Sequence, residues 1–231
     1  MVIVMKRIVS LFVFLVFSYI SYAQASGGQI KRDVSKKKTS TPVVKQKVTK
    51  YSYSTPQVVD LGLPSGTLWA DCNLGANFPE EKGYVFPWGE TIPCERSNRY
   101  KDNGMPKETI QNTQKLELKD DAAYVNLGSS WCMPTHEQFK ELTNCDHTEI
   151  IWANQNGTCG LRIRSKYNGN TIFIPTSGKS YAPNYGYYWT SDIDRQDNRQ
   201  AYSLVFNEDG VRDITNGMRY QGRSIRPVYN P

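Results

Sequence analysis

Glycine and proline recur at short intervals through residues 57–231, so this part of the chain has room only for short helices and strands. The segments between them are rich in aromatic and β-branched side chains, which favour strands. Asn168-Gly169 has the sequence of a hairpin turn, which joins antiparallel strands, and Asp209-Gly210 is another turn sequence. We therefore expect small antiparallel sheets, with strands at 58–61, 67–72, 150–153, 160–165, 171–174, 187–191, 201–207, 211–214 and 224–229.

A first short helix is expected over residues 119–127. Asp120 and Asp121 favour the start of a helix, where their side chains accept hydrogen bonds from free backbone N–H groups. Gly128 suits the position after a helix, because glycine adopts a positive φ without steric cost. Residues 90–114, in contrast, show no hydrophobic period and are expected to form a long loop.

A second helix is expected within the stretch SWCMPTHEQFKEL, residues 130–142. Thr135 and Gln138 have the spacing of a capping box, and Phe139 and Leu142 then share one apolar face. The other side chains divide into expected core residues, Trp131 and Met133, and expected solvent-facing residues, His136, Glu137, Lys140 and Glu141. Two short helices followed by a strand-rich second half indicate an α+β fold.

Residues 1–23 have the pattern of a secretory signal peptide. Lys6 and Arg7 precede an apolar run over 8–20, and Ser21-Tyr22-Ala23 supplies small residues at the usual cleavage positions. The apolar run is shorter than the roughly 20 residues that a transmembrane helix needs. We expect an exported protein with no stable membrane span after cleavage, located in the periplasm, on the cell surface or outside the cell.

Residues 24–56 form a basic segment that is expected to be a disordered linker. They contain eight Lys or Arg, one acidic residue and few apolar side chains with which to form a core. Such a segment can touch an anionic surface or act as a solvated spacer. Residues 57–231 hold 18 basic and 21 acidic side chains, although the whole chain is +6. A nucleic-acid-binding domain carries a basic face of its own, so a domain of this charge is not expected to bind nucleic acid.

Six segments of residues 57–231 occur in an order that resembles a known family. They are VVDLGLPSGTLWADCNLGA, FPWGET, LKDDAAYVNLGSSWCMPTHEQFKEL, NTIFIPTSG, GYYWTSD and RSIRPV. Together they resemble the Fibrobacter succinogenes major paralogous domain, which is abundant in exported proteins of Bacteroidetes. MPTHEQFKEL and IRPV are also similar to segments of the formylglycine-generating enzymes, or sulfatase-modifying factors. The resemblance implies a C-type lectin-like domain over residues 57–231, whose long loops and small antiparallel sheets display a ligand-binding surface.

Three catalytic arrangements are conceivable, and each lacks a residue or is interrupted. Formylglycine-generating enzymes bind copper through two cysteines in the C-terminal part of the domain, and no Cys follows Cys159 here. A metalloprotease helix needs a second His four residues after His136, where Lys140 stands. A Cys132–His136 nucleophile pair is interrupted by Pro134, which breaks any helix joining the two. We therefore expect no catalytic residue and no cofactor.

Two metal sites are conceivable from residue types alone. Thiolate and imidazole are zinc ligands, but Cys132, His136, Cys145 and His147 have the spacing of no zinc module. Calcium-dependent sugar binding in C-type lectin-like folds uses Glu-Pro-Asn or Gln-Pro-Asp followed by Trp-Asn-Asp. The nearest segments here, Ala182-Pro183-Asn184 and Trp189-Thr190-Ser191-Asp192, lack the first carboxylate and the second motif, so no bound metal is expected. Disulfides are permitted in an exported protein, and their pairing is left open among Cys72, Cys94, Cys132, Cys145 and Cys159.

The C-terminal third carries the residue types of a recognition surface. Tyr and Arg supply rigid contact area, and Asn and Ser supply adaptable hydrogen bonds. Polar loops and strand edges have a similar composition, so a purely structural role is the alternative. The candidate ligand-binding residues are Tyr181, Asn184, Tyr185, Asp192, Arg195, Asn198, Arg199, Asn216, Arg219 and Tyr220.

These observations favour a non-enzymatic, exported domain that recognises a protein or glycan at the cell surface through its C-terminal loops. Two alternatives stay open. One is an enzyme similar to the sulfatase-modifying factors, and the other is a structural envelope protein without a discrete ligand.

Overall fold

The structure is a computed structural model that describes residues 51–94, 115–178 and 182–231. Contacts between residues divide the chain into two units, Met1–Lys47 and Val48–Pro231, and all the described residues belong to the second. The predicted signal peptide, residues 24–50 of the predicted linker and residues 95–114 of the predicted loop lie outside the described residues. In the described part, no helix is both long and apolar enough to cross a membrane.

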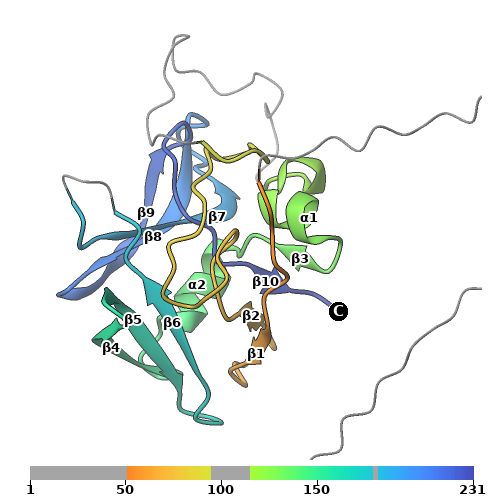
Figure 1. The fold of residues 1–231 in the computed structure, drawn as a ribbon. Helices are drawn as coiled ribbons and strands as arrows, with labels where there is room; N and C mark the ends of the chain where they lie inside the picture. The colour runs from red at the N-terminus through yellow and green to blue at the C-terminus, as the bar shows by residue number, and fades with distance from the viewer. Residues whose placement is uncertain (1–50, 95–114, 179–181) are drawn as a thin grey trace, which may run out of the picture. The chain divides into compact units, whose positions relative to one another are not determined.

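The described residues form an α+β fold of mostly antiparallel strands with few helices, as the sequence predicts (Figure 1). Each predicted strand overlaps an observed one, and the first predicted helix begins with a 3-10 turn, η1. In chain order the elements are β1 (Val58–Asp60), β2 (Leu68–Ala70), η1 (Leu118–Asp120), α1 (Ala122–Leu127), β3 (Trp131–Cys132), α2 (His136–Leu142), β4 (Thr148–Gln155), β5 (Thr158–Ser165), β6 (Thr171–Pro175), β7 (Gly186–Ile193), β8 (Gln200–Asn207), β9 (Gly210–Met218) and β10 (Val228–Tyr229).

The strands of the described part form three sheets, with the orders β1-β2-β10-β3, β4-β5-β6 and β7-β8-β9. The second and third are meanders in which consecutive strands pair antiparallel. Gly169 lies in the turn between β5 and β6 with φ +77°, and Gly210 follows the turn between β8 and β9 with φ +108°. Glycine tolerates these φ values, and both predicted turns lie in antiparallel hairpins. Residues 166–170 join β5 to β6, whereas Glu208 and Asp209 join β8 to β9 and Gly210 already pairs with Asn207.

Strand β10 closes the first sheet by pairing Val228 with β2 and β3. Just before it, the fully buried side chain of Arg226 donates to the backbone oxygens of Ala70 and Phe173, at 3.1 and 2.7 Å. The guanidinium therefore joins the first sheet to β6 of the second. The predicted strand over 224–229 is wrong in extent: residues 224–227 pass through the core to place Arg226, and only Val228–Tyr229 forms a strand in the first sheet.

Helix α1 depends on the buried carboxylate of Asp121. Its Oδ1 accepts hydrogen bonds from the backbone nitrogens of Ala123 and Tyr124, at 2.8 and 3.1 Å, which confirms its predicted place at the helix start. The α-helix itself begins at Ala122, later than the predicted residue 119. Its Oδ2 accepts from the nitrogen of Met133, next to β3, at 2.8 Å. Burial raises the pKa of Asp121, and the three N–H donors oppose this rise. One side chain thus caps the helix and fixes it to the following strand.

Helix α2 begins with the predicted capping box. The nitrogen of Gln138 donates to Oγ1 of Thr135 at 3.2 Å, and the nitrogen of Thr135 donates to Oε1 of Gln138 at 2.8 Å. The predicted core residues in and near the helix are all buried: Trp131, Met133, Phe139 and Leu142. Of the predicted solvent-facing residues, Glu137 and Lys140 are exposed. His136 and Glu141 are half-buried instead, because each contacts a neighbouring element.

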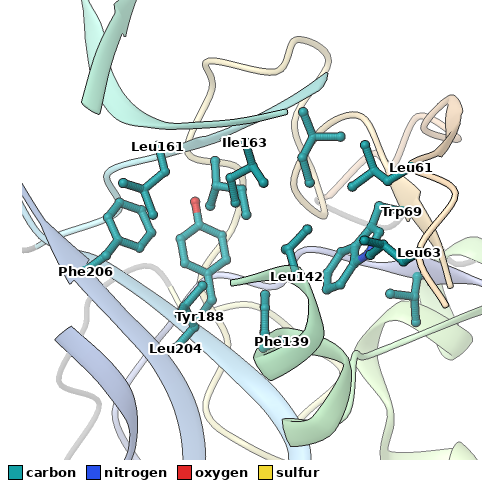
Figure 2. Close-up of a cluster of buried hydrophobic side chains, with 13 residues drawn as sticks. Leu61, Leu63, Trp69, Phe139, Leu142, Leu161, Ile163, Tyr188, Leu204 and Phe206 are labelled. Carbon is teal, nitrogen blue, oxygen red and sulfur yellow. The ribbon is translucent and has the colours of Figure 1, made fainter. Parts of the chain in front are cut away.

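Phe139 and Leu142 enter the main core cluster, which Figure 2 shows between α2, the strands and the segment around Trp69. All three sheets contribute to this cluster. Its members are Leu61, Leu63, Trp69, Phe139, Leu142, Leu161, Ile163, Ile172, Ile174, Tyr188, Leu204, Phe206 and Val228. Burial of these side chains against one another is the main force that holds the three small sheets together.

A second core cluster contains Trp88, Trp189 and Ile225 and lies against α1 through Ala122 and Ala123. Tyr53, in the segment predicted as linker, packs against this cluster, and its ring meets that of Tyr84 at 5.6 Å. The thiols of four cysteines form no disulfide within the described part: Cys72, Cys132, Cys145 and Cys159.

Candidate functional site

The candidate ligand-binding residues fall at two ends of strand β7. Six of them lie in the β7–β8 loop, residues 194–199, or at the end of β9, residues 216–220. We call these two segments the loop face, which contains Arg195, Asn198, Arg199, Asn216, Arg219 and Tyr220. The pairing of Gln200 with Met218 places the two segments side by side. Their residue types and their adjacency make the loop face the best-formed candidate surface.

Three hydrogen bonds hold the loop face together. Nδ2 of Asn216 donates to Oδ2 of Asp194 at 2.5 Å, and the backbone nitrogen of Arg219 donates to the oxygen of Arg199 at 3.0 Å. Nη1 of Arg219 donates to the oxygen of Asn198 at 2.9 Å. The loop and the strand end therefore form one cross-linked unit, which lowers the entropy that a ligand would have to remove on binding.

Arg219 is a buried member of the loop face, with only 4% of its surface exposed. Its guanidinium stacks on the ring of Trp88, 4.7 Å from the ring centroid. Its Nε and Nη2 are shielded from solvent and have no hydrogen-bond acceptor. Burial lowers the pKa of Arg219, although an arginine remains charged at physiological pH. A buried cation therefore presents one unpartnered edge.

The exposed part of the loop face carries two more arginines. Arg199 forms a two-fold contact with Asp197, whose Oδ1 and Oδ2 accept from Nε and Nη2 at 2.8 and 2.9 Å. Hydrogen bonds from Arg199 and Gln200 hold the pKa of the Asp197 carboxyl well below its usual range. Arg195 is exposed, and its side chain contacts no charged group among the described residues. Tyr220 is half-buried beside Arg219.

Asn184 and Tyr185 precede β7 and do not belong to the loop face. The eight residues of β7 separate the two groups by roughly 25 Å. Asn184 is exposed, and the ring of Tyr185 stacks on Tyr187 with centroids 5.8 Å apart. Tyr181 lies outside the described residues. In the described part of the chain, the predicted ligand-binding residues therefore fall into two separate groups.

Asp192, which is also predicted to bind a ligand, contacts the start of helix α2 in the structure. Its Oδ2 accepts a hydrogen bond from the backbone nitrogen of His136, the first residue of α2, at 2.6 Å. The positive end of the helix and this N–H group stabilise the carboxylate there. The two residues are 56 positions apart, so no local pattern could have indicated the contact.

Two residues that the sequence analysis did not select support the loop face or the neighbouring strands. Trp88, within the FPWGET motif, is fixed by a hydrogen bond from its Nε1 to the oxygen of Thr190 at 2.7 Å and carries Arg219. Arg223 stacks on Trp189 at 4.4 Å. A Cβ on Gly217 would lie 1.9 Å from Nη2 of Arg223, so a larger residue there would have to displace the guanidinium from its place on Trp189. The sequence shows these aromatic and cationic residues, but not which of them stack on one another.

The described residues contain no group of three or more His, Cys, Asp and Glu that could hold a metal ion. His136 lies against the ring of Tyr202, and His147 bonds through Nδ1 to the hydroxyl of Tyr167 at 2.7 Å. Burial, followed by the charge of Asp121, raises the pKa of Cys132 to about 11. This thiol is therefore protonated near neutral pH and is a weak nucleophile.

A shallow groove of about 400 Å³ runs along the exposed side of α2. The nitrogen of Ser65 donates to Oε1 of Glu141 at 2.8 Å, and Oγ of Ser65 donates to Oε2. Nζ of Lys140 pairs with Oε1 of Glu137 at 3.3 Å. The charged groups of this groove thus already have partners, which makes it a weaker candidate than the loop face.

Comparisons of this chain with protein-family models, with curated proteins and with solved structures find no match.

Proposed function

We propose that the chain is an exported, non-enzymatic C-type lectin-like binding protein of the Fibrobacter succinogenes major paralogous domain family, and that its loop face recognises an anionic group on a glycan or protein at the cell surface. The unpartnered Nε–Nη2 edge of the buried Arg219 carries this proposal. The six ordered motifs support the family assignment, and the pattern of residues 1–23 supports export.

The edge of Arg219 matches the shape of a carboxylate or sulfate. Nε and Nη2 of a guanidinium lie side by side and donate two parallel hydrogen bonds to two oxygens. A buried donor without an acceptor costs about 1–3 kcal/mol, and more when it is charged, so such groups are rare in folded proteins. An anionic acceptor at Nε and Nη2 would offset that cost. Because both atoms are shielded from solvent, binding requires a movement that opens this edge.

The charge around this edge also favours an anion. Arg195 and Arg199 are exposed cations on the loop face. The nearby carboxylates already accept hydrogen bonds within the loop face, Asp197 from Arg199 and Asp194 from Asn216. The loop-face segments 194–199 and 216–220 hold three arginines and two aspartates, a net charge of +1, whereas residues 57–231 as a whole carry an excess of acidic groups. This local excess of positive charge favours an anionic ligand.

The experiment measures capture of the purified full chain on arrays of acidic glycans, neutral glycans and bacterial surface proteins. We expect capture on ligands with carboxylate or sulfate groups. The double variant Arg195→Gln/Arg199→Gln is expected to weaken capture and its salt dependence. Arg219→Lys keeps the charge but removes the two-fold donor edge, and it is also expected to weaken capture.

The matched control is Arg164→Gln/Arg212→Gln, which removes two exposed charges outside the loop face. This variant is expected to bind as the wild type does. Urea unfolding of each variant separates loss of binding from loss of the fold. Capture of neutral ligands alone, or equal capture by wild type and by the stable loop-face variants, would show that the proposal is wrong.

A further inference from the structure

A small cavity of about 170 Å³ lies between the loop that follows β2 and the sheet β4-β5-β6. Asp71 and Pro79 line it from the loop, and Gln155, Arg162, Thr171 and Phe173 line it from the sheet. The cavity contains none of the loop-face residues. Anything that binds there binds at a separate site.

The sheet side of the cavity is fixed by strand register. Arg162 of β5 lies directly opposite Phe173 of β6, so both side chains are on one face of the sheet. The ring of Phe173 covers Gly160, where a Cβ would lie 2.8 Å from Cζ. Phe173 is only 4% exposed, whereas Arg162 is half-buried. The result is an apolar floor beside a cation.

The loop after β2, which forms the other wall of the cavity, is held by hydrogen bonds at Asp71 and at Glu80. Oδ1 of Asp71 accepts from the nitrogen of Gln57 at 2.9 Å. The carboxylate of Glu80 accepts from Nδ2 of Asn156 at 2.6 Å and from Nε2 of Gln155 at 3.3 Å, which ties the loop to the turn between β4 and β5. The cavity is therefore preorganised, and its walls do not need to be ordered by a ligand.

Two opposite charges face this cavity without meeting. The guanidinium of Arg162 makes no hydrogen bond or ion pair with another described residue, in contrast to Arg199. Asp71 uses Oδ1 for the backbone of Gln57 and forms no ion pair with Arg162. A half-buried guanidinium beside an apolar floor is partly desolvated, so it gains from an anionic acceptor.

We propose that this cavity binds a small zwitterion of the α-amino acid class. The ligand carboxylate would accept two hydrogen bonds from Arg162, its ammonium group would donate to Asp71, and an aliphatic side chain would pack on Phe173 and Pro79. A simple anion would be repelled by the Asp71 carboxylate, and a neutral sugar would leave Arg162 without an anionic partner. The cavity is smaller than the roughly 300–1,000 Å³ of sites for drug-sized ligands, which limits it to a single amino-acid-sized molecule.

The test measures binding of L-leucine to the purified full chain by isothermal titration calorimetry and by shifts of backbone amide resonances. Two analogues each lack one charge: L-leucinamide has no carboxylate, and 4-methylpentanoate has no ammonium group. We expect saturable binding of leucine and binding at least about tenfold weaker for each analogue, since each loses one charge-assisted contact.

Two variants test the same contacts from the protein side. Arg162→Gln removes the two-fold donor, and Asp71→Asn removes the charge but keeps an oxygen for the nitrogen of Gln57. Each is expected to weaken leucine binding at least about tenfold. The control is Arg164→Gln, an exposed arginine on the same strand that does not line the cavity, and it is expected to bind as the wild type does.

Equal binding of 4-methylpentanoate and leucine would identify a general anion site and overturn the proposal, as would unchanged binding by stable Arg162 and Asp71 variants. No saturable binding of leucine would overturn it as well. The loop-face variants are expected to leave leucine binding unchanged. The outcome therefore does not depend on whether the loop face binds a glycan or protein.

Discussion

Replacing Asp192 with alanine is expected to destabilise the domain without changing ligand capture. In the structure, Oδ2 of Asp192 accepts a hydrogen bond from the backbone nitrogen of His136 at 2.6 Å, at the start of α2. Alanine removes this acceptor and leaves the first N–H group of the helix without a protein partner. Since α2 carries Phe139 and Leu142 into the main core, fraying of its first turn is transmitted to the packing.

The expected loss of stability follows from the interactions of the Asp192 carboxylate with the start of α2. A hydrogen bond to a charged group contributes about 1.5–3 kcal/mol, and a carboxylate at a helix N-terminus contributes about 0.3–1 kcal/mol. Asp192 is half-buried, so water replaces part of the lost interaction. We expect a net loss of about 1–2 kcal/mol in the free energy of unfolding.

Urea unfolding followed by tryptophan fluorescence measures this loss. With a slope of about 2 kcal/mol/M, the unfolding midpoint of Asp192→Ala is expected to fall by about 0.5–1 M. Thr135→Ala calibrates the assay, because it removes the capping-box acceptor of the same helix and is expected to cost about 1 kcal/mol. Capture of the ligand identified for the loop face is measured on the same samples.

The result that refutes this reasoning is an Asp192→Ala variant with the wild-type midpoint and abolished capture. Asp192 would then be a ligand-binding residue, as the sequence pattern predicts, and its contact with α2 would be incidental. A lower midpoint with full capture agrees with the structural role.

Three further predictions concern other parts of the described domain. Gly217→Ala should lower the free energy of unfolding by about 1–3 kcal/mol in urea, because its Cβ would clash with Arg223; an unchanged midpoint would contradict that packing. In native protein near neutral pH, iodoacetamide should modify the exposed Cys145 before Cys132, whose pKa of about 11 keeps it protonated; mass spectrometry reports the order, and equal rates would contradict it. Burial raises the pKa of Tyr188 from 10.0 to about 12, so its unfolded form ionises first, and the free energy of unfolding should fall as pH rises from about 10 to about 12. Native ultraviolet absorbance measures this titration, and ionisation of every tyrosine near pH 10 in folded protein would contradict the burial.

The sequence predicts features that depend on neighbouring residues. The capping box of Thr135 and Gln138 requires contacts over three positions, and both are present. Asp121 caps α1, and Gly169 and Gly210 adopt the positive φ expected at the turns. In each case the residue type itself restricts the local backbone, so the prediction needs no knowledge of the rest of the fold.

The sequence predicts less well those features that depend on residues far apart in the chain. The composition of the C-terminal third identified residues of the loop face, but it also included Asp192, whose partner in α2 is 56 residues away. It did not indicate that Asn184 and Tyr185 lie at the opposite end of β7. The predicted strand 224–229 is too long, because the pattern of side chains does not show that Arg226 donates to backbone oxygens of two distant strands.

By itself, the sequence determined the α+β composition of the domain, the starts of its two helices and its hairpin turns, because these follow from backbone preferences and short-range hydrogen bonds. Tertiary structure alone decided which polar side chains remain available for a ligand. Oδ2 of Asp192 accepts a hydrogen bond from α2, whereas Arg219 and Arg162 have side-chain N–H groups without an acceptor among the described residues. The physical reason is that a polar group can bind a ligand only when no donor or acceptor from elsewhere in the fold already bonds to it. The packing of the sheets determines which distant segments lie within hydrogen-bond distance of each polar group.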